Sequence, residues 1–116
     1  MKADVVVVGA GPAGLAAAIA AKENGAESVA IIDREERPGG ILRQCIHNGF
    51  GLHVFGEELT GPEYAARFID RANALGVRCL TETMVLNISA DRVVTAVGPQ
   101  TGLISIEAGA VVLAMG

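Results

Sequence analysis

The fold of this protein is decided by VVVVGAGPAGLAAAIAAKENGAESVAIID, which runs from Val5 to Asp33. Ala3 to Val8 ends in four consecutive β-branched valines, which is typical of a strand buried on both faces of a parallel sheet. Pro12 to Asn24 is rich in alanine and predicts a helix that Gly25 ends. Ser28 to Asp33 predicts a second buried strand. The segment therefore predicts a βαβ unit with parallel strands and a right-handed crossover.

The turn between the first strand and the helix carries three glycines in the spacing G-x-G-x-x-G, namely Gly9, Gly11 and Gly14. In a dinucleotide-binding turn the first glycine permits the sharp bend, the second lets the backbone approach a pyrophosphate, and the third lets the helix lie close to the strand. The helix N-terminus then presents free N–H groups and a positive dipole end to the phosphates. This spacing predicts a site for the ADP half of a dinucleotide.

An acidic residue ends the second predicted strand at the distance that this fingerprint requires. Asp33 lies 19 residues after Gly14, and its carboxylate can accept hydrogen bonds from ribose hydroxyls. The same negative charge would repel a 2′-phosphate, which disfavours NADP. Neither feature distinguishes FAD from NAD. A glycine turn that binds no ligand is the remaining alternative.

After the βαβ unit, the sequence predicts a long loop, then a helix, and then a series of strands. Arg34 to Leu59 shows no periodicity and predicts a long loop, whereas Thr60 and Glu63 form a capping box that starts a helix ended by Gly76. The predicted strands that follow are Val77 to Leu80, then Thr83 to Ile88, Arg92 to Val97 and Leu103 to Glu107 as a β-meander, and finally Ala110 to Ala114. The predicted fold class is α/β: a Rossmann-like βαβ unit with a parallel sheet and a three-stranded meander.

Composition limits the function classes. The chain has 116 residues, 51% of them apolar, and a formal net charge of -4, so one domain with one core is expected. Its lysines and arginines are scattered, which argues against nucleic-acid binding. Its longest later apolar run, Ala13 to Ala21, falls short of the roughly 20 residues that a membrane span needs. The two cysteines form no CxxC motif, and a reducing cytoplasmic location is expected.

The GAGPAG turn, Asp33, the Pro38-Gly39-Gly40 motif, the meander and the final AMG resemble the two-dinucleotide-binding-domain flavoproteins, which include the pyridine nucleotide-disulfide oxidoreductases. The resemblance implies that residues 1–116 are part of an FAD-binding domain in a longer protein. It also implies contacts to FAD from the following residues: Gly9, Gly11, Pro12, Ala13, Gly14, Asp33, Arg34, Gly39, Gly40, Val85, Ala114 and Gly116. Met115 replaces the threonine of the family's ATG-type motif, which removes a hydroxyl from that position.

The long loop GGILRQCIHNGFGLHVFGEELTGPEY resembles FAD-dependent oxidoreductases associated with anaerobic glycerol-3-phosphate dehydrogenase, and flavoprotein subunits of opine and proline dehydrogenases. This resemblance implies hydride transfer between flavin and NAD(P)H or a small organic substrate. Any NAD(P)H site would lie in sequence beyond Gly116. The expected partners are FAD and a small-molecule substrate, while a homo-oligomer and a partner redox subunit both stay open.

The sequence does not identify a catalytic residue, and the chain need not hold an acid–base group, because a bound flavin would itself carry the redox chemistry. Cys45 lacks the second cysteine of a disulfide reductase and is expected to be a packing thiol; Cys79 is expected in the core. His47 and His53 are expected to be loop histidines, and no metal site is predicted. Two alternatives remain: an NAD-binding Rossmann module without flavin, and a fragment that is inactive alone.

Overall fold

The computed structural model describes residues 1–40 and 61–115, which form one six-stranded sheet and two helices. Along the chain the elements are β1 (Lys2–Val8), α1 (Pro12–Glu23), β2 (Val29–Ile32), α2 (Gly61–Ala74), β3 (Arg78–Leu80), β4 (Met84–Ile88), β5 (Val93–Gly98) and β6 (Gly102–Leu113). The strands lie in the order β3-β2-β1-β6-β5-β4. Within the described residues, neither helix is long and apolar enough to cross a membrane.

The predicted βαβ unit is confirmed. β1 and β2 are parallel neighbours, with Val5 opposite Val29 and Val8 opposite Ile32. α1 begins at Pro12 and is followed by Asn24, whose backbone N–H donates to the carbonyl of Ala20 at 3.0 Å. β3 adds a further parallel strand beside β2.

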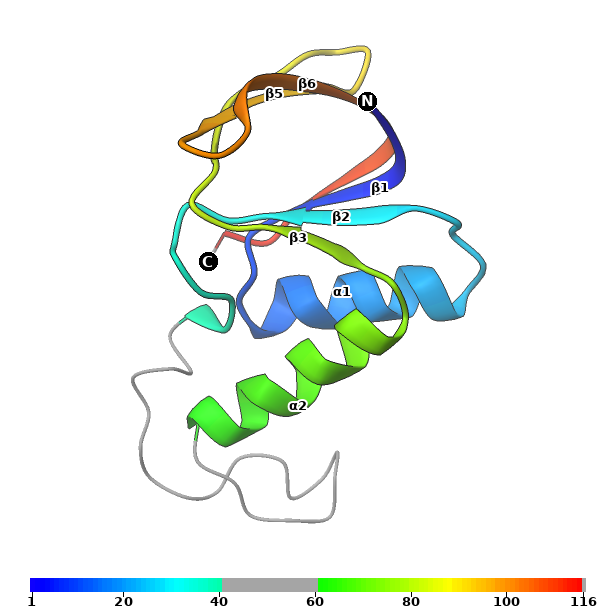
Figure 1. Ribbon diagram of the computed structural model, residues 1–116. Helices are drawn as coiled ribbons and strands as arrows, with labels where there is room; N and C mark the ends of the chain where they lie inside the picture. The colour runs from blue at the N-terminus through cyan, green and yellow to red at the C-terminus, as the bar shows by residue number, and fades with distance from the viewer. Residues whose placement is uncertain (41–60, 116) are drawn as a thin grey trace.

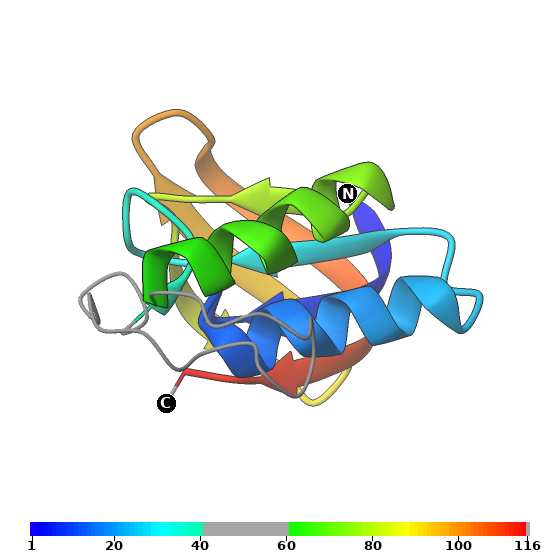
Figure 2. The same cartoon turned by 90° about the horizontal axis from the view of Figure 1, so that it is seen from below.

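The parallel strands are covered on both faces. α1 and α2 lie side by side on one face, and the meander folds over the opposite face (Figures 1 and 2). Successive valines of β1 divide between two apolar clusters: Val7 packs on the helix side with Leu15 and Ile31, whereas Val6 packs on the meander side with Ile106. This two-sided burial explains why the strand reads as an uninterrupted valine run.

α2 packs on the helix-side cluster through the apolar face that its periodicity predicts. Phe68, Ile69 and Leu75 lie against that cluster, and the rings of Tyr64 and Phe68 meet edge to face with centroids 5.0 Å apart. An ion pair of 2.8 Å between Arg71 and Glu23 joins the two helices at the surface. The predicted cap at Thr60 lies outside the described residues.

The sheet differs from the prediction at its centre. The two strands predicted at Leu103–Glu107 and Ala110–Ala114 are one 12-residue strand, β6. Its first half pairs antiparallel with β5 and its second half pairs parallel with β1, so that Glu107 lies opposite both Val93 and Lys2. Gly109 allows this close pairing, because a Cβ there would lie 2.7 Å from the carbonyl oxygen of Asp4.

Replacing Gly109 with alanine tests the role of this contact in holding the meander to the parallel sheet. The added methyl group would press on the backbone of β1, and we expect the free energy of unfolding to fall by about 1–3 kcal/mol. Urea denaturation measures it. Ser105→Ala, at an exposed position of the same strand, is the matched control and should stay within about 0.5 kcal/mol of the original chain. Equal stability of the two variants would contradict this account of β6.

Candidate nucleotide-binding site

The candidate site lies where β1, β2 and β6 end. The chain passes from β1 to β2 on one side, while β6 occupies the other side of β1. In open α/β sheets, ligands bind in the crevice outside the carboxyl ends of the strands where the strand order reverses in this way. The glycine turn between β1 and α1 sits at this point, with Asp33 at the end of β2 and Ala114 at the end of β6 on either side.

Two glycines of the turn are required by close backbone contacts. Gly9 has φ +110° and donates its N–H to the carbonyl of Ile32 at 2.8 Å. A Cβ on Gly9 would collide with the carbonyl oxygen of Ala114, and a Cβ on Gly14 would collide with the carbonyl oxygen of Gly9. The first turn of α1 therefore packs directly on the end of β1, with no side chain between them.

Gly11 differs from these two glycines because a Cβ there would meet no atom of residues 1–40 or 61–115 within 4 Å. It is the N-cap of α1 and offers no side-chain cap, and Pro12 follows as the first helical residue. Within the part of the chain that the structure describes, the backbone N–H groups of Ala13 and Gly14 have no acceptor. The helix thus begins with open space and free donors, which is the environment that a phosphate group needs.

Asp33 organises the turn through hydrogen bonds that the sequence did not reveal. Its Oδ2 accepts from the backbone N–H of Ala10 at 2.6 Å, and its Oδ1 accepts from the backbone N–H of Glu35 at 2.8 Å. A carboxylate oxygen can accept a second hydrogen bond, so ribose hydroxyls remain compatible with this arrangement. The carboxylate therefore fixes the turn and the loop after β2 relative to each other.

Gly39 and Gly40 bring the loop back against the turn. The N–H of Gly39 donates to the carbonyl of Ala10 at 2.7 Å, so both backbone polar groups of Ala10 are held. Gly40 has φ +57°, and a Cβ there would lie 3.0 Å from the Cα of Gly11. These contacts place both predicted glycines beside the turn. The positive φ of each, +119° at Gly39 and +57° at Gly40, and the close approach at Gly40 favour glycine at these positions.

The other predicted site residues lie at varied distances from the turn. Ala114 donates its N–H to the carbonyl of Val8 at 2.8 Å and so borders Gly9. Val85 is half-buried, with its side chain against the meander-side cluster, and follows Thr83, whose N–H donates to the carbonyl of Asp33 at 2.9 Å. Arg34 is exposed and lies 3.9 Å from the carboxylate of Glu35, a weak surface ion pair. Gly116 is outside the described residues.

Cys45, His47 and His53 also fall outside the described residues, so their predicted roles stay predictions. Cys79 is half-buried and packs on the helix-side cluster, as expected of a core thiol. Burial raises the pKa of the Cys79 thiol above its ordinary value, and the negative charge of Asp33 adds to the rise. The thiol therefore stays protonated and is a poor nucleophile.

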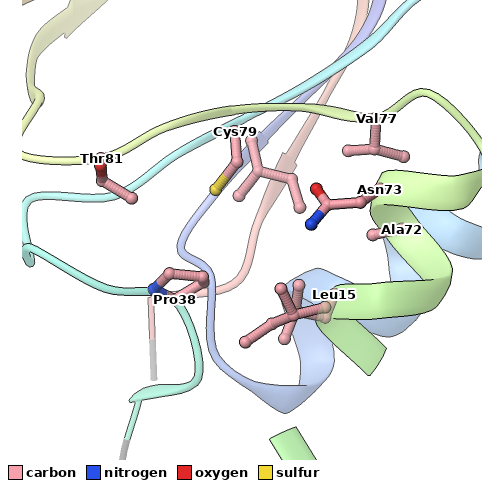
Figure 3. Close-up of a pocket in the computed structure, with 9 residues that line it drawn as sticks. Leu15, Pro38, Ala72, Asn73, Val77, Cys79 and Thr81 are labelled. Atoms are coloured by element: carbon pink, nitrogen blue, oxygen red, sulfur yellow. The ribbon is translucent and has the colours of Figure 1, made fainter. Parts of the chain in front are cut away.

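Cys79 borders a cavity of about 230 Å³ between the helices and the sheet (Figure 3). Its walls are mainly apolar and include Leu15, Ile31 and Val77, and Asn73 also lines it. None of the turn glycines borders this cavity. The open space beside Gly11 is therefore separate from this cavity. Among residues 1–40 and 61–115, no group of three metal-ligating side chains occurs.

The residues present fit the ADP half of a dinucleotide. Gly11 leaves room for the pyrophosphate, the start of α1 supplies donors, and Asp33 stands at the end of the neighbouring strand. The arrangement can bind and orient a diphosphate and a ribose.

Comparison with known proteins agrees with this geometry. Residues 4–85 match the family described as FAD dependent oxidoreductase. Because this match covers more than half of the chain, the protein belongs to that family of FAD-dependent oxidoreductases.

Individual relatives show the same relationship. The chain is 44% identical over 62 residues to an opine oxidase subunit of Agrobacterium tumefaciens (strain Ach5), which covers 53% of this chain and 11% of that protein. It is 37% identical over 81 residues to thioredoxin reductase of Ureaplasma parvum serovar 3 (strain ATCC 700970), and this match covers 68% of this chain and 24% of that protein. The crystal structure of L-proline dehydrogenase from P. horikoshii superposes with a TM-score of 0.83 at 26% sequence identity. The superposition covers 100% of this chain and 23% of the chain in that structure. The chain spans about a quarter or less of each.

Asp33→Asn tests the clamp on the turn. The amide has one acceptor oxygen instead of two, so the N–H of Ala10 or of Glu35 loses its partner. Because hydrogen bonds to charged groups contribute about 1.5–3 kcal/mol, we expect the free energy of unfolding to fall by about 2 kcal/mol. Urea denaturation reports the loss, with Glu36→Gln on the exposed part of the same loop as the control. A variant as stable as the control would show that the carboxylate does not hold the turn.

The raised pKa of Cys79 predicts a pH dependence of stability. In the unfolded chain the thiol ionises near its ordinary pKa, whereas the folded chain retains the proton. The folded state therefore loses stability relative to the unfolded state as pH rises through about 9. We expect unfolding measured from pH 7 to 10 to show a smaller alkaline loss in Cys79→Ala than in the original chain. If the free energy of unfolding falls equally with pH in the two proteins, the pKa of the Cys79 thiol is not raised by folding.

Proposed function

We propose that this chain is the N-terminal part of the FAD-binding domain of a longer FAD-dependent oxidoreductase, and that its glycine turn holds the ADP half of FAD. The observation that carries the proposal is Gly11: it is the one turn glycine whose missing side chain leaves open space beside free helix N–H groups. This chain covers only 11%, 24% and 23% of the lengths of the three relatives described above, which supports a longer protein.

In this proposal the chain binds and orients the cofactor. The backbone N–H groups of Ala13 and Gly14 would donate to the pyrophosphate, and Asp33 would accept from the adenosine ribose while holding Ala10. The backbone around the pyrophosphate would be shaped by Gly9, Pro12, Gly39, Gly40, Ala114 and Gly116. Arg34 would lie beside the ribose, and the backbone of Val85 would lie against adenine. When bound, FAD supplies the two-electron redox chemistry.

The reaction of the whole protein is proposed as hydride transfer between flavin and either NAD(P)H or a small organic substrate, in the cytoplasm. Opine oxidase and L-proline dehydrogenase are named for organic substrates. An association with anaerobic glycerol-3-phosphate dehydrogenase, which the sequence of the long loop suggests, is part of this proposal. The opine oxidase relative is named as one subunit of its enzyme, which supports a partner redox subunit over a homo-oligomer. Residues 1–116 alone are expected to bind FAD weakly and to be inactive.

Gly11→Ala in the longer polypeptide tests the proposed cofactor site. The added methyl group meets no atom in the described part of the chain, so the stability of the FAD-free protein should not change. It would occupy the space of the pyrophosphate, and we expect FAD affinity to fall at least tenfold, or about 1.4 kcal/mol. Visible absorbance and fluorescence titration measure the bound flavin, with Ala20→Ser on the exposed side of α1 as the control.

The same titration separates the two dinucleotides. Binding of FAD by the original protein, lost in Gly11→Ala and kept in Ala20→Ser, supports the proposal. A colourless protein that binds NADH but cannot be reconstituted with FAD would replace it with an NAD-binding module.

A further inference from the structure

The outer face of the meander carries a row of exposed apolar side chains. Met84, Val97 and Leu103 lie directly opposite one another on β4, β5 and β6. Their exposed fractions are 51%, 37% and 70%, and Leu86, at the bulge in β4, is 55% exposed. We call these four residues the meander patch.

The pairing register shows that the meander patch points away from the parallel strands. Side chains alternate between the two faces of a strand. Val94, Ala96 and Ile106 are buried in the meander-side cluster, which also contains Val6 and Val8 of β1 and Ile32 of β2. Figure 1 shows the meander folded over these two strands. Residues one position away from the buried meander residues, including Val97, therefore face outward. The meander thus has apolar side chains on both faces, although the parallel sheet covers only one.

The outward row next to the patch is uncharged, and the row after it carries Glu107 on β6. The row next to the patch consists of Asn87, Thr95 and Ser105, which also lie opposite one another. Neither this row nor the patch row contains a charged residue, and the patch row is apolar, whereas the solvent-facing side of an antiparallel sheet is usually polar. An apolar centre beside uncharged polar groups is the composition of a protein interface core.

The size of the patch favours a partner on the same polypeptide. Four side chains at these exposures present on the order of 400 Å² of apolar surface, within the range of functional patches on single proteins. A stable complex between separate molecules buries roughly 800 Å² on each partner. A segment already joined to the chain avoids the entropy cost of association, so a patch of this size suffices for it.

We infer that the meander patch is covered by an uncharged, apolar surface of the same polypeptide that lies outside residues 1–116. This inference rests on the proposed function, in which the chain is part of a longer flavoprotein. It is supported by the relatives, of which this chain spans 24% and 23% in the thioredoxin reductase and the proline dehydrogenase. The meander would then join the cofactor-binding domain to the remainder of the enzyme, opposite the helices.

Cysteine labelling of the longer polypeptide tests this inference. Leu103→Cys and Leu86→Cys report on the patch, and Gln100→Cys, in the exposed turn between β5 and β6, is the matched control. Each is alkylated with iodoacetamide and read peptide by peptide, so that Cys45 and Cys79 do not interfere. Rates are normalised to those in urea. We expect both patch cysteines to react at least tenfold more slowly than Gln100→Cys.

The outcomes separate the occupants. Slow labelling that persists on dilution supports a covering surface on the same polypeptide. Slow labelling that is lost on dilution identifies a second copy of the protein as the covering surface and overturns the inference. Fast labelling that slows only when a partner protein is added also overturns the inference. Bound flavin is measured in the same samples. A protein that binds no FAD but whose patch cysteines react slowly would contradict the proposed function and would still support this inference.

Discussion

The close packing of Gly14 on the carbonyl of Gly9 is the constraint on which the rest of the structure depends. With no side chain between them, α1 can start within a few residues of the end of β1 and lie along the sheet. The helix thus begins beside Gly11, where no atom of the described residues lies within 4 Å of a Cβ position. The geometry of the fold and the binding site for an anion thus have one cause: three glycines at fixed spacing, each excluding a side chain for a different reason.

Ala10 connects this turn to the rest of the site through its backbone. Asp33 accepts from its N–H and Gly39 donates to its carbonyl, so the ends of β1 and β2 and the following loop form one hydrogen-bonded unit. The same unit reaches the meander, because Asp33 and Glu35 also accept from the N–H groups of Thr83 and Glu82. A site held by backbone contacts is rigid before the ligand arrives, which lowers the ordering cost of binding.

Local features allowed most of this fold to be predicted from the sequence. The valine run, the alanine-rich helix and the glycine spacing each reflect neighbours close along the chain, and the structure has all three where they were expected. The continuity of β6 could not be predicted, because it depends on Gly109 meeting Asp4 across more than 100 residues of sequence. The hydrogen bonds of Asp33 were missed for the same reason: an acid at the end of a strand predicts a ribose contact but does not reveal which N–H groups lie nearby.

The most direct test of the account is to locate where ADP, half of the proposed cofactor, contacts the protein. Residues 1–116 labelled with ¹⁵N are titrated with millimolar ADP, which detects the weak binding expected of this part alone. The account predicts the largest amide shifts at Ala10 to Gly14 and at Asp33 to Glu35, with little change around the cavity at Cys79 and Asn73. Shifts centred on that cavity, or none at the glycine turn, would contradict it.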